Sequence, residues 1–131
     1  MINDPVADLL TRIRNASLCG ADETVVPYSN LKYHVTKILI KEGYVIDAII
    51  EDGPNGISKI IKIKLCGEDA KLITHIKRIS KPGRRVYVRS INIPKPLRGM
   101  GCVIVSTSKG VVTGKDAKNF GLGGEILCEI W

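Results

Sequence analysis

Apolar residues recur every three or four positions in two segments near the start of the sequence, whereas later segments alternate apolar and polar residues. The first spacing is typical of amphipathic helices and the second of half-buried strands. Asp4-Pro5 and Ser29 or Asn30 suit the starts of the two helices, because Asp, Ser and Asn accept hydrogen bonds from unpaired amides and proline needs no amide proton there. The pattern predicts an α+β fold built from short elements.

Residues 1–69 are expected to form an N-terminal α-β-α-β-β unit. Its helices would end near Leu18–Gly20 and at Gly43, since glycine commonly ends a helix. A cluster of turn-forming residues at 52–56 separates the last two strands. The three expected strands span residues 23–28, 44–51 and 57–65.

Residues 70–131 are expected to form a β-rich domain with one or two short helices. Residues 72–79 are expected to form a strand, and residues 85–89 form the returning strand, in which basic or aromatic residues alternate with valine. Residues 81–84 between them suit a type II turn. A connection rich in proline and glycine follows at 93–101. Further strands are expected at 102–106, 111–113 and 124–131, with a short helix at 114–120.

Charge is divided unevenly between these two halves. The whole chain has a formal net charge of +7, from 20 basic and 13 acidic residues. Residues 1–70 hold eight Lys and Arg against ten Asp and Glu, whereas residues 71–131 hold twelve against three, and no acidic residue lies between Asp69 and Asp116. We therefore expect a domain boundary at residues 69 and 70, and a basic half that meets a polyanion such as nucleic acid.

The sequence shows no convincing catalytic group. His34 and His75 lie about forty residues apart and have no evident partner. Residues 110–116 resemble a phosphate-binding loop, but the first glycine comes one residue late and Asp116 stands where a hydroxyl would bind magnesium. Residues 121–126 lack the last glycine of a dinucleotide-binding loop. We expect no enzyme, cofactor or metal; an enzyme holding a phosphate-bearing cofactor at these glycines is an alternative.

The four cysteines are Cys19, Cys66, Cys102 and Cys128, and their spacing does not suit a zinc site. Cys102 and Cys128 lie in apolar runs and are expected to be buried. No apolar run approaches the roughly 18 residues of a membrane span, and the start has no basic segment typical of a secretory signal. A cytoplasmic chain with reduced thiols is therefore expected.

Three consecutive hydroxyl side chains, Ser106, Thr107 and Ser108, leave an apolar strand just before Lys109 and Gly110. Hydroxyls both donate and accept hydrogen bonds, and double-stranded RNA exposes 2′-hydroxyls and base edges in its shallow minor groove. Lys109 adds a charge for phosphate, and Gly110 lets the backbone pass close to a ligand. The segment suits RNA binding, although serine, threonine and glycine are also ordinary turn-forming residues.

A run of glycines ahead of Glu125 is a second candidate for RNA contact. Gly123 and Gly124 would offer a flat surface, and the Glu125 carboxylate would accept a hydrogen bond from a base amino group or a 2′-hydroxyl. Two alternatives stay open. The glycines would serve only to end a helix and enter a strand, or Glu125 would pair with an arginine.

Tyr87 lies between Arg85 and Arg89, in a segment whose other two residues are valines. It would stack on a base or sugar, or else pack in the core. Arg84, in the basic turn just before this segment, is also expected to contact RNA.

Four segments give the chain its resemblance to a known family: DPVADLLTRIRN at residues 4–15, ISKPGRRVY at 79–87, STSKG at 106–110 and GLGGE at 121–125. The first looks like the family's opening helix, the second like its central hairpin, and the last two like its most diagnostic pair. The chain thus resembles the ribosomal protein S-eight family, the eighth protein of the small subunit, in its bacterial form, nearly from end to end.

This resemblance implies a two-domain structural protein of the small ribosomal subunit. It implies direct, early binding to the central domain of 16S ribosomal RNA and a part in assembling the subunit platform. Family members bind one irregular RNA helix chiefly through the C-terminal domain, a role that would fall on Ser106, Thr107, Ser108, Lys109, Tyr87 and Glu125. The N-terminal domain would touch further RNA through Thr11, Arg12, Arg14, Ser29 and Lys32.

The partners that the resemblance implies are ribosomal RNA, neighbouring small-subunit proteins and, as in some relatives, the messenger RNA of the protein itself, which it would repress. The protein would be cytoplasmic and ribosome-bound, with no membrane or small-molecule partner. The alternative is a general basic protein of the nucleoid or of messenger RNA, which would show little preference between RNA sequences.

Overall fold

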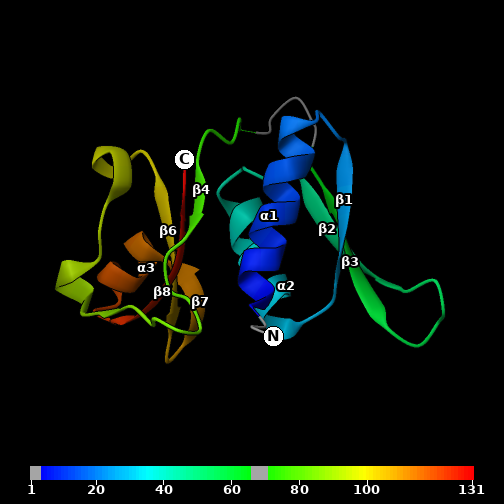
Figure 1. Ribbon diagram of the computed structural model, residues 1–131. Helices are drawn as coiled ribbons and strands as arrows, with labels where there is room; N and C mark the ends of the chain where they lie inside the picture. The colour runs from blue at the N-terminus through cyan, green and yellow to red at the C-terminus, as the bar shows by residue number, and fades with distance from the viewer. Residues whose placement is uncertain (1–3, 66–70) are drawn as a thin grey trace. The chain divides into compact units, whose positions relative to one another are not determined.

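The computed structural model describes residues 4–65 and 71–131, which form two compact units (Figure 1). The described residues from Pro5 to Ile73 make up the first unit, and Thr74–Trp131 together with Asp4 make up the second. The predicted boundary at residues 69 and 70 falls outside the described residues and stays a prediction. Both units contain helix and antiparallel sheet, so the predicted α+β class is confirmed.

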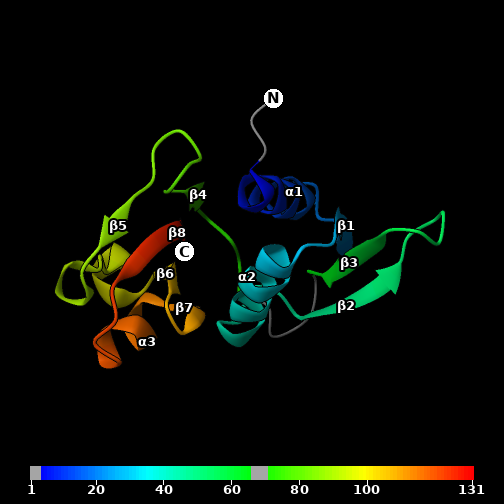
Figure 2. The ribbon, with the colours of Figure 1, turned by 90° about the horizontal axis from the view of Figure 1, so that it is seen from below.

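The first unit has the predicted α-β-α-β-β order. Its elements are α1 (Pro5–Leu18), β1 (Glu23–Pro27), α2 (Asn30–Lys41), β2 (Asp47–Asp52) and β3 (Lys59–Lys64). The strands form an antiparallel sheet in the order β1-β3-β2, and both helices lie on one side of it (Figure 2). Ser29 caps α2, because its Oγ accepts a hydrogen bond from the Lys32 amide over 3.1 Å.

Burial in this unit follows the apolar spacing of the sequence. The stripe of α1, which is Val6, Leu9, Leu10 and Ile13, is at most 2% exposed. The central strand β3 adds fully buried residues at alternate positions, Ile61 and Ile63. Each such side chain contributes roughly 1.5–3 kcal/mol when it leaves water.

The strand predicted at 44–51 begins later than expected. The amides of Tyr44 and Val45 both donate to the Leu39 carbonyl oxygen, over 3.0 and 3.3 Å, and so finish the end of α2. Gly43 makes this possible, because its φ of +86° suits glycine. The apolar character of Tyr44 and Val45 reflects their burial at this helix end and not a place in the sheet.

The second unit is built around one long strand. Its elements are β4 (Ile76–Arg78), β5 (Tyr87–Val88), the 3₁₀ turns η1 (Ser90–Asn92) and η2 (Pro96–Gly99), β6 (Cys102–Thr107), β7 (Gly110–Thr113), α3 (Gly114–Asn119) and β8 (Gly124–Ile130). The antiparallel sheet has the order β4-β8-β6-β7, with β5 also paired to β8. Its core contains Ile93, Val103, Val105, Ala117 and Ile126.

The predicted hairpin at residues 72–89 is wrong. β4 and β5 both pair with β8, and because β6 occupies the other edge of β8, they follow one another along the same edge. Residues 81–85 loop out between them (Figure 2). The turn at residues 81–84 is also not of type II, because Gly83 lacks the positive φ that this type requires. Alternation tells which face a residue takes but not which strand it pairs with.

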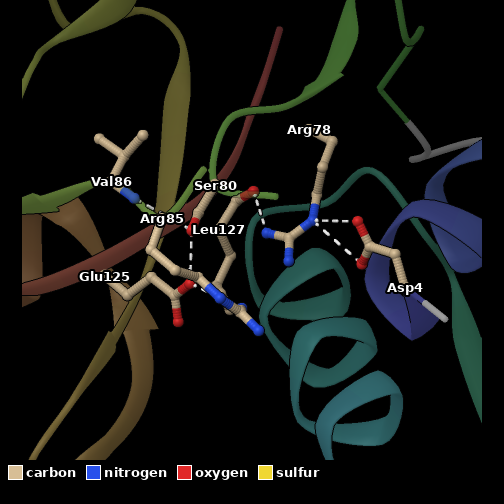
Figure 3. A network of polar contacts seen from close by, with 7 residues as sticks. All are labelled: Asp4, Arg78, Ser80, Arg85, Val86, Glu125 and Leu127. Carbon is tan, nitrogen blue, oxygen red and sulfur yellow. Dashed lines mark hydrogen bonds and ion pairs between the residues drawn. The ribbon is translucent and has the colours of Figure 1, made fainter. Parts of the chain in front are cut away.

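A β-bulge interrupts the pairing of β6 with β8. Ile104 lies opposite Cys128 and Val105 opposite Ile126, so Leu127 has no partner on β6. The Leu127 carbonyl oxygen accepts hydrogen bonds from the Ile79 amide over 3.0 Å and from Arg78 Nη1 over 2.6 Å (Figure 3). The bulge thus turns a main-chain acceptor toward an arginine.

Cys102 and Cys128 are buried, as predicted, and Cys19 is exposed. Cys66 lies outside the described residues. Burial raises the pKa of Cys128 to about 12, and the neighbouring Cys102 adds to this rise. The Cys128 thiol therefore stays protonated and unreactive at neutral pH.

Candidate nucleic-acid interface

The turn between β6 and β7 displays most of the predicted hydroxyl segment. Ser108 and Lys109 form its exposed tip, and Gly110 follows with a φ of +111°. The Thr107 hydroxyl is used within the turn, where it donates to the Gly110 carbonyl oxygen over 2.8 Å and accepts from the Lys109 amide over 3.2 Å. Thr107 therefore shapes the turn, while Ser108 and Lys109 face solvent.

Three predicted residues share one row across the sheet. Tyr87 of β5 lies opposite Glu125 of β8, and Glu125 lies opposite Ser106 of β6. Directly opposed residues of antiparallel strands place their side chains on the same face. Tyr87 is 69% exposed, so its alternative place in the core is excluded. We call Tyr87, Glu125, Ser106 and the turn residues 107–110 the candidate RNA face.

The glycines ahead of Glu125 allow close approach of the backbone. A β-carbon at Gly123 would lie 2.4 Å from the Val88 carbonyl oxygen, and one at Gly124 would lie 2.1 Å from that of Ser106. Gly121, with a φ of +68°, follows α3 as a helix-ending glycine. These glycines thus end α3 and lead into β8, as the first alternative expects. RNA contact by Gly123 and Gly124 stays a prediction.

Glu125 also pairs with an arginine, as the second alternative expects. Its Oε2 accepts hydrogen bonds from Ser80 Oγ and from Arg85 Nη1, the latter over 3.0 Å (Figure 3). Ser80 is fully buried and Arg85 half exposed. The sequence alone does not predict either residue at the site. The sequence around Ser80 does not indicate its contact with Glu125, because only the pairing register of β8 brings the two residues together.

Arg84 lies exposed in the loop between β4 and β5, together with Lys81. The amide of each of these residues donates to the carbonyl oxygen of the other, over 2.9 and 3.0 Å, which closes the loop tip. Their side chains bring two positive charges to the loop that leads to Tyr87. Contact of Arg84 with RNA stays a prediction.

The residues of the first unit that are predicted to contact RNA differ in their exposure to solvent. Thr11, Arg12 and Arg14 of α1 are exposed. Lys32, in contrast, is 6% exposed, and its ammonium donates to Asp8 Oδ2 over 3.3 Å and to the Pro27 carbonyl oxygen over 3.1 Å.

A lysine held in this way cannot reach a phosphate without breaking both contacts. Its neighbour Ser29 is likewise used as the cap of α2. RNA contact by Ser29 and Lys32 stays a prediction. The resemblance to the family implies these contacts, whereas the burial of Lys32 reflects its tertiary contact with Asp8.

Asp8 accepts from Arg12 Nε over 3.0 Å as well as from Lys32. Partial burial of the carboxyl acts to raise its pKa, but the hydrogen bonds and charges of Arg12 and Lys32 outweigh it, so the pKa of Asp8 lies below its ordinary value. Arg12 also donates to the Val25 carbonyl oxygen over 3.0 Å. Arg12 is thus exposed but already partnered.

Because the pKa of Asp8 is lowered on folding, its contribution to stability should be complete above its unfolded pKa of about 3.9 and lost as the pH falls through the lowered value. Urea unfolding of the wild type and of Asp8→Asn should therefore differ at neutral pH and converge in acid. A difference in the free energy of unfolding that stays constant down to about pH 2 would contradict this assignment.

One other sequence interpretation, that of His75, is corrected. His75 does have a partner: its Nε2 lies 3.1 Å from Glu129 Oε1, and its ring stacks on Trp131 with ring centroids 3.9 Å apart. The segment resembling a phosphate loop is not an open loop, because residues 110–113 form β7 and pair with β6. Within the described part of the chain, no helix is long and apolar enough to cross a membrane.

Sequence comparison finds related proteins over nearly the whole chain. The family model described as Ribosomal protein S8 matches residues 4–131. The chain is 48% identical over 132 residues to the small ribosomal subunit protein uS8 of Clostridium novyi, covering 100% of this chain and 99% of the relative. It is also 48% identical to that of Syntrophomonas wolfei, with the same coverage, and 45% identical to that of Clostridioides difficile over 99% of this chain and 98% of the relative. The chain belongs to the ribosomal protein S8 family.

Proposed function

We propose that this protein binds the central domain of the small-subunit ribosomal RNA directly, chiefly through the candidate RNA face, and so helps to assemble the subunit platform. Membership of the ribosomal protein S8 family makes the chain a structural constituent of the small ribosomal subunit and not an enzyme. It is bound to the ribosome in the cytoplasm, where its partners are ribosomal RNA and other subunit proteins.

The observation that carries the proposal is the shared row of Tyr87, Glu125 and Ser106 beside the exposed turn. The row combines an aromatic ring for stacking, a carboxylate acceptor and a hydroxyl, while the turn tip adds Ser108 and Lys109. Such a mixture suits base edges and 2′-hydroxyls better than it suits phosphates alone. The surrounding half of the chain supplies attraction for phosphate, with twelve basic residues against three acidic ones.

Binding to the isolated central-domain helix of the small-subunit RNA from the same organism tests the proposal. A scrambled duplex of equal length serves as competitor, and the titration is repeated at several salt concentrations. Preference for the cognate helix that persists at physiological salt supports the proposal. Equal binding to both duplexes that collapses with salt would leave only a basic surface, and would contradict it.

Ser106→Ala should weaken binding to the cognate helix by about 0.5–1.5 kcal/mol, because one hydrogen bond is lost. Binding to the scrambled duplex and the salt dependence should stay as in the wild type. Lys109→Gln should behave in the opposite way, weakening both duplexes alike and reducing the salt slope by about one unit. Ser58→Ala, at an exposed serine of the other unit, is the control. Wild-type affinity of Ser106→Ala for the cognate helix would exclude Ser106 from the interface.

Two finer parts of the proposal use the same titration. Thr11 and Arg14, exposed on α1, would contact RNA outside the central helix, so their loss should matter only with longer central-domain transcripts.

The messenger RNA of the protein itself would bind the candidate RNA face where its fold mimics the ribosomal site. The leader transcript should then compete with the cognate helix, and Ser106→Ala should weaken both.

A further inference from the structure

A buried hydroxyl fixes the carboxylate at the centre of the candidate RNA face. Ser80 is 0% exposed, and its Oγ lies where β4 ends and the looped-out residues 81–85 begin. The oxygen accepts a hydrogen bond from the Val86 amide over 3.2 Å and donates to Glu125 Oε2 (Figure 3). Because the Val86 amide supplies the proton on one side, the single hydroxyl proton of Ser80 is directed at Glu125.

Arg85 holds the same oxygen from the solvent side. Its Nη1 donates to Glu125 Oε2 over 3.0 Å, and its side chain is 48% exposed while that of Glu125 is 16% exposed. The arginine also offsets the negative charge of Glu125, which would otherwise repel phosphate. Two donors thus converge on one carboxylate oxygen, one rigid and buried, the other charged and accessible.

The other oxygen, Oε1, accepts no hydrogen bond from any described residue in this network (Figure 3). An ionised carboxylate only accepts hydrogen bonds. An RNA group brought against Oε1 is therefore favoured when it is a donor, such as a base amino group or a 2′-hydroxyl, and disfavoured when it is a phosphate or carbonyl oxygen. Such penalties against the wrong ligand contribute to specificity.

We propose that Ser80 is a positioning residue for RNA selectivity: with Arg85 it fixes Glu125 so that Oε1 accepts only from a donor group of the RNA. The inference rests on the proposed function, because it places Glu125 against RNA. It assigns selectivity to a side chain that itself has no access to the ligand.

Ser80→Ala should reduce the preference for the cognate central-domain helix over the scrambled duplex by about tenfold, since a hydrogen bond to a charged group is lost. The salt slope should not change, because no charge is removed. In a Glu125→Gln background, where the carboxylate is already gone, Ser80→Ala should have little further effect. Additive losses in this double-mutant cycle would mean that Ser80 acts on the fold and not through Glu125.

Arg85→Gln and Arg84→Gln keep the inference testable if Ser80→Ala does not fold. Both remove one charge from the same exposed loop, but only Arg85 binds Glu125. Both should flatten the salt slope equally, and only Arg85→Gln should lower the preference for the cognate helix. Equal preference in the two variants would overturn the inference, whereas absence of any preference in the wild type would instead overturn the proposed function.

Discussion

Gly124→Ala should lower the free energy of unfolding of the second unit by about 3 kcal/mol, the upper end of the range for overpacking. The new β-carbon would lie 2.1 Å from the Ser106 carbonyl oxygen and 3.0 Å from its carbon. These are main-chain atoms of the paired strand, so no side-chain rotation relieves the clash and β6 must move away from β8. Urea unfolding measures the loss, and affinity for the cognate RNA helix should fall with it.

Gly83→Ala is the matched control for this variant. A β-carbon at Gly83 meets no atom within 4 Å, and its φ is not in the left-handed region. The control should therefore unfold within about 0.5 kcal/mol of the wild type. If Gly124→Ala had the same urea midpoint as the control, the close approach of β6 and β8 would be adjustable and the glycine would not be required there.

Arg78→Ala should cost about 3 kcal/mol, the loss typical of breaking a buried ion pair from one side. The Arg78 side chain is 9% exposed and that of Asp4 is 13% exposed. The guanidinium donates through Nε to both Asp4 carboxylate oxygens, over 3.1 and 3.3 Å, and through Nη1 to the carbonyl oxygen of Leu127 at the bulge (Figure 3). Removing the guanidinium takes away three hydrogen bonds, made by two donor nitrogens, from buried or nearly buried oxygens.

Lys62→Ala provides the comparison for Arg78→Ala. Lys62 pairs with Glu23 over 3.7 Å, with both side chains more than a third exposed. An exposed pair of this kind contributes about 0–1 kcal/mol. Thermal and urea unfolding should separate the two variants clearly, and similar losses would show that Arg78 gains nothing from its burial and its contact with Leu127.

The parts of the fold that could be predicted depend on local signals. The start and end of α2 follow from Ser29 and Gly43, whose chemistry acts within a few residues. The buried stripe of α1 follows from spacing alone. The pairing of β4 and β5 could not be predicted in this way, because their common partner β8 lies more than thirty residues further along the chain.

The same distinction applies to the candidate site. The hydroxyl turn and Tyr87 were found from residue type and neighbours, and the structure places them at the surface. The contacts of Ser80 and Lys32 could not be predicted, because their partners Glu125 and Asp8 lie 45 and 24 residues away in sequence. Charge and composition identify the basic half of the chain. They do not show which polar side chains already have hydrogen-bond partners within the protein.

The central place of β8 has a consequence for synthesis. β4, β5 and β6 all precede β8 in the chain, yet each is hydrogen-bonded to it. As the nascent chain leaves the translating ribosome, the first unit can close its sheet once β3 has emerged. In the second unit β6 can pair with β7, but the pairing of β4, β5 and β6 with β8 must wait for residues 124–130. Because Glu125 lies on β8, the row of Tyr87, Glu125 and Ser106 is complete only then, and a nascent chain cannot present the whole candidate RNA face before β8 has been made.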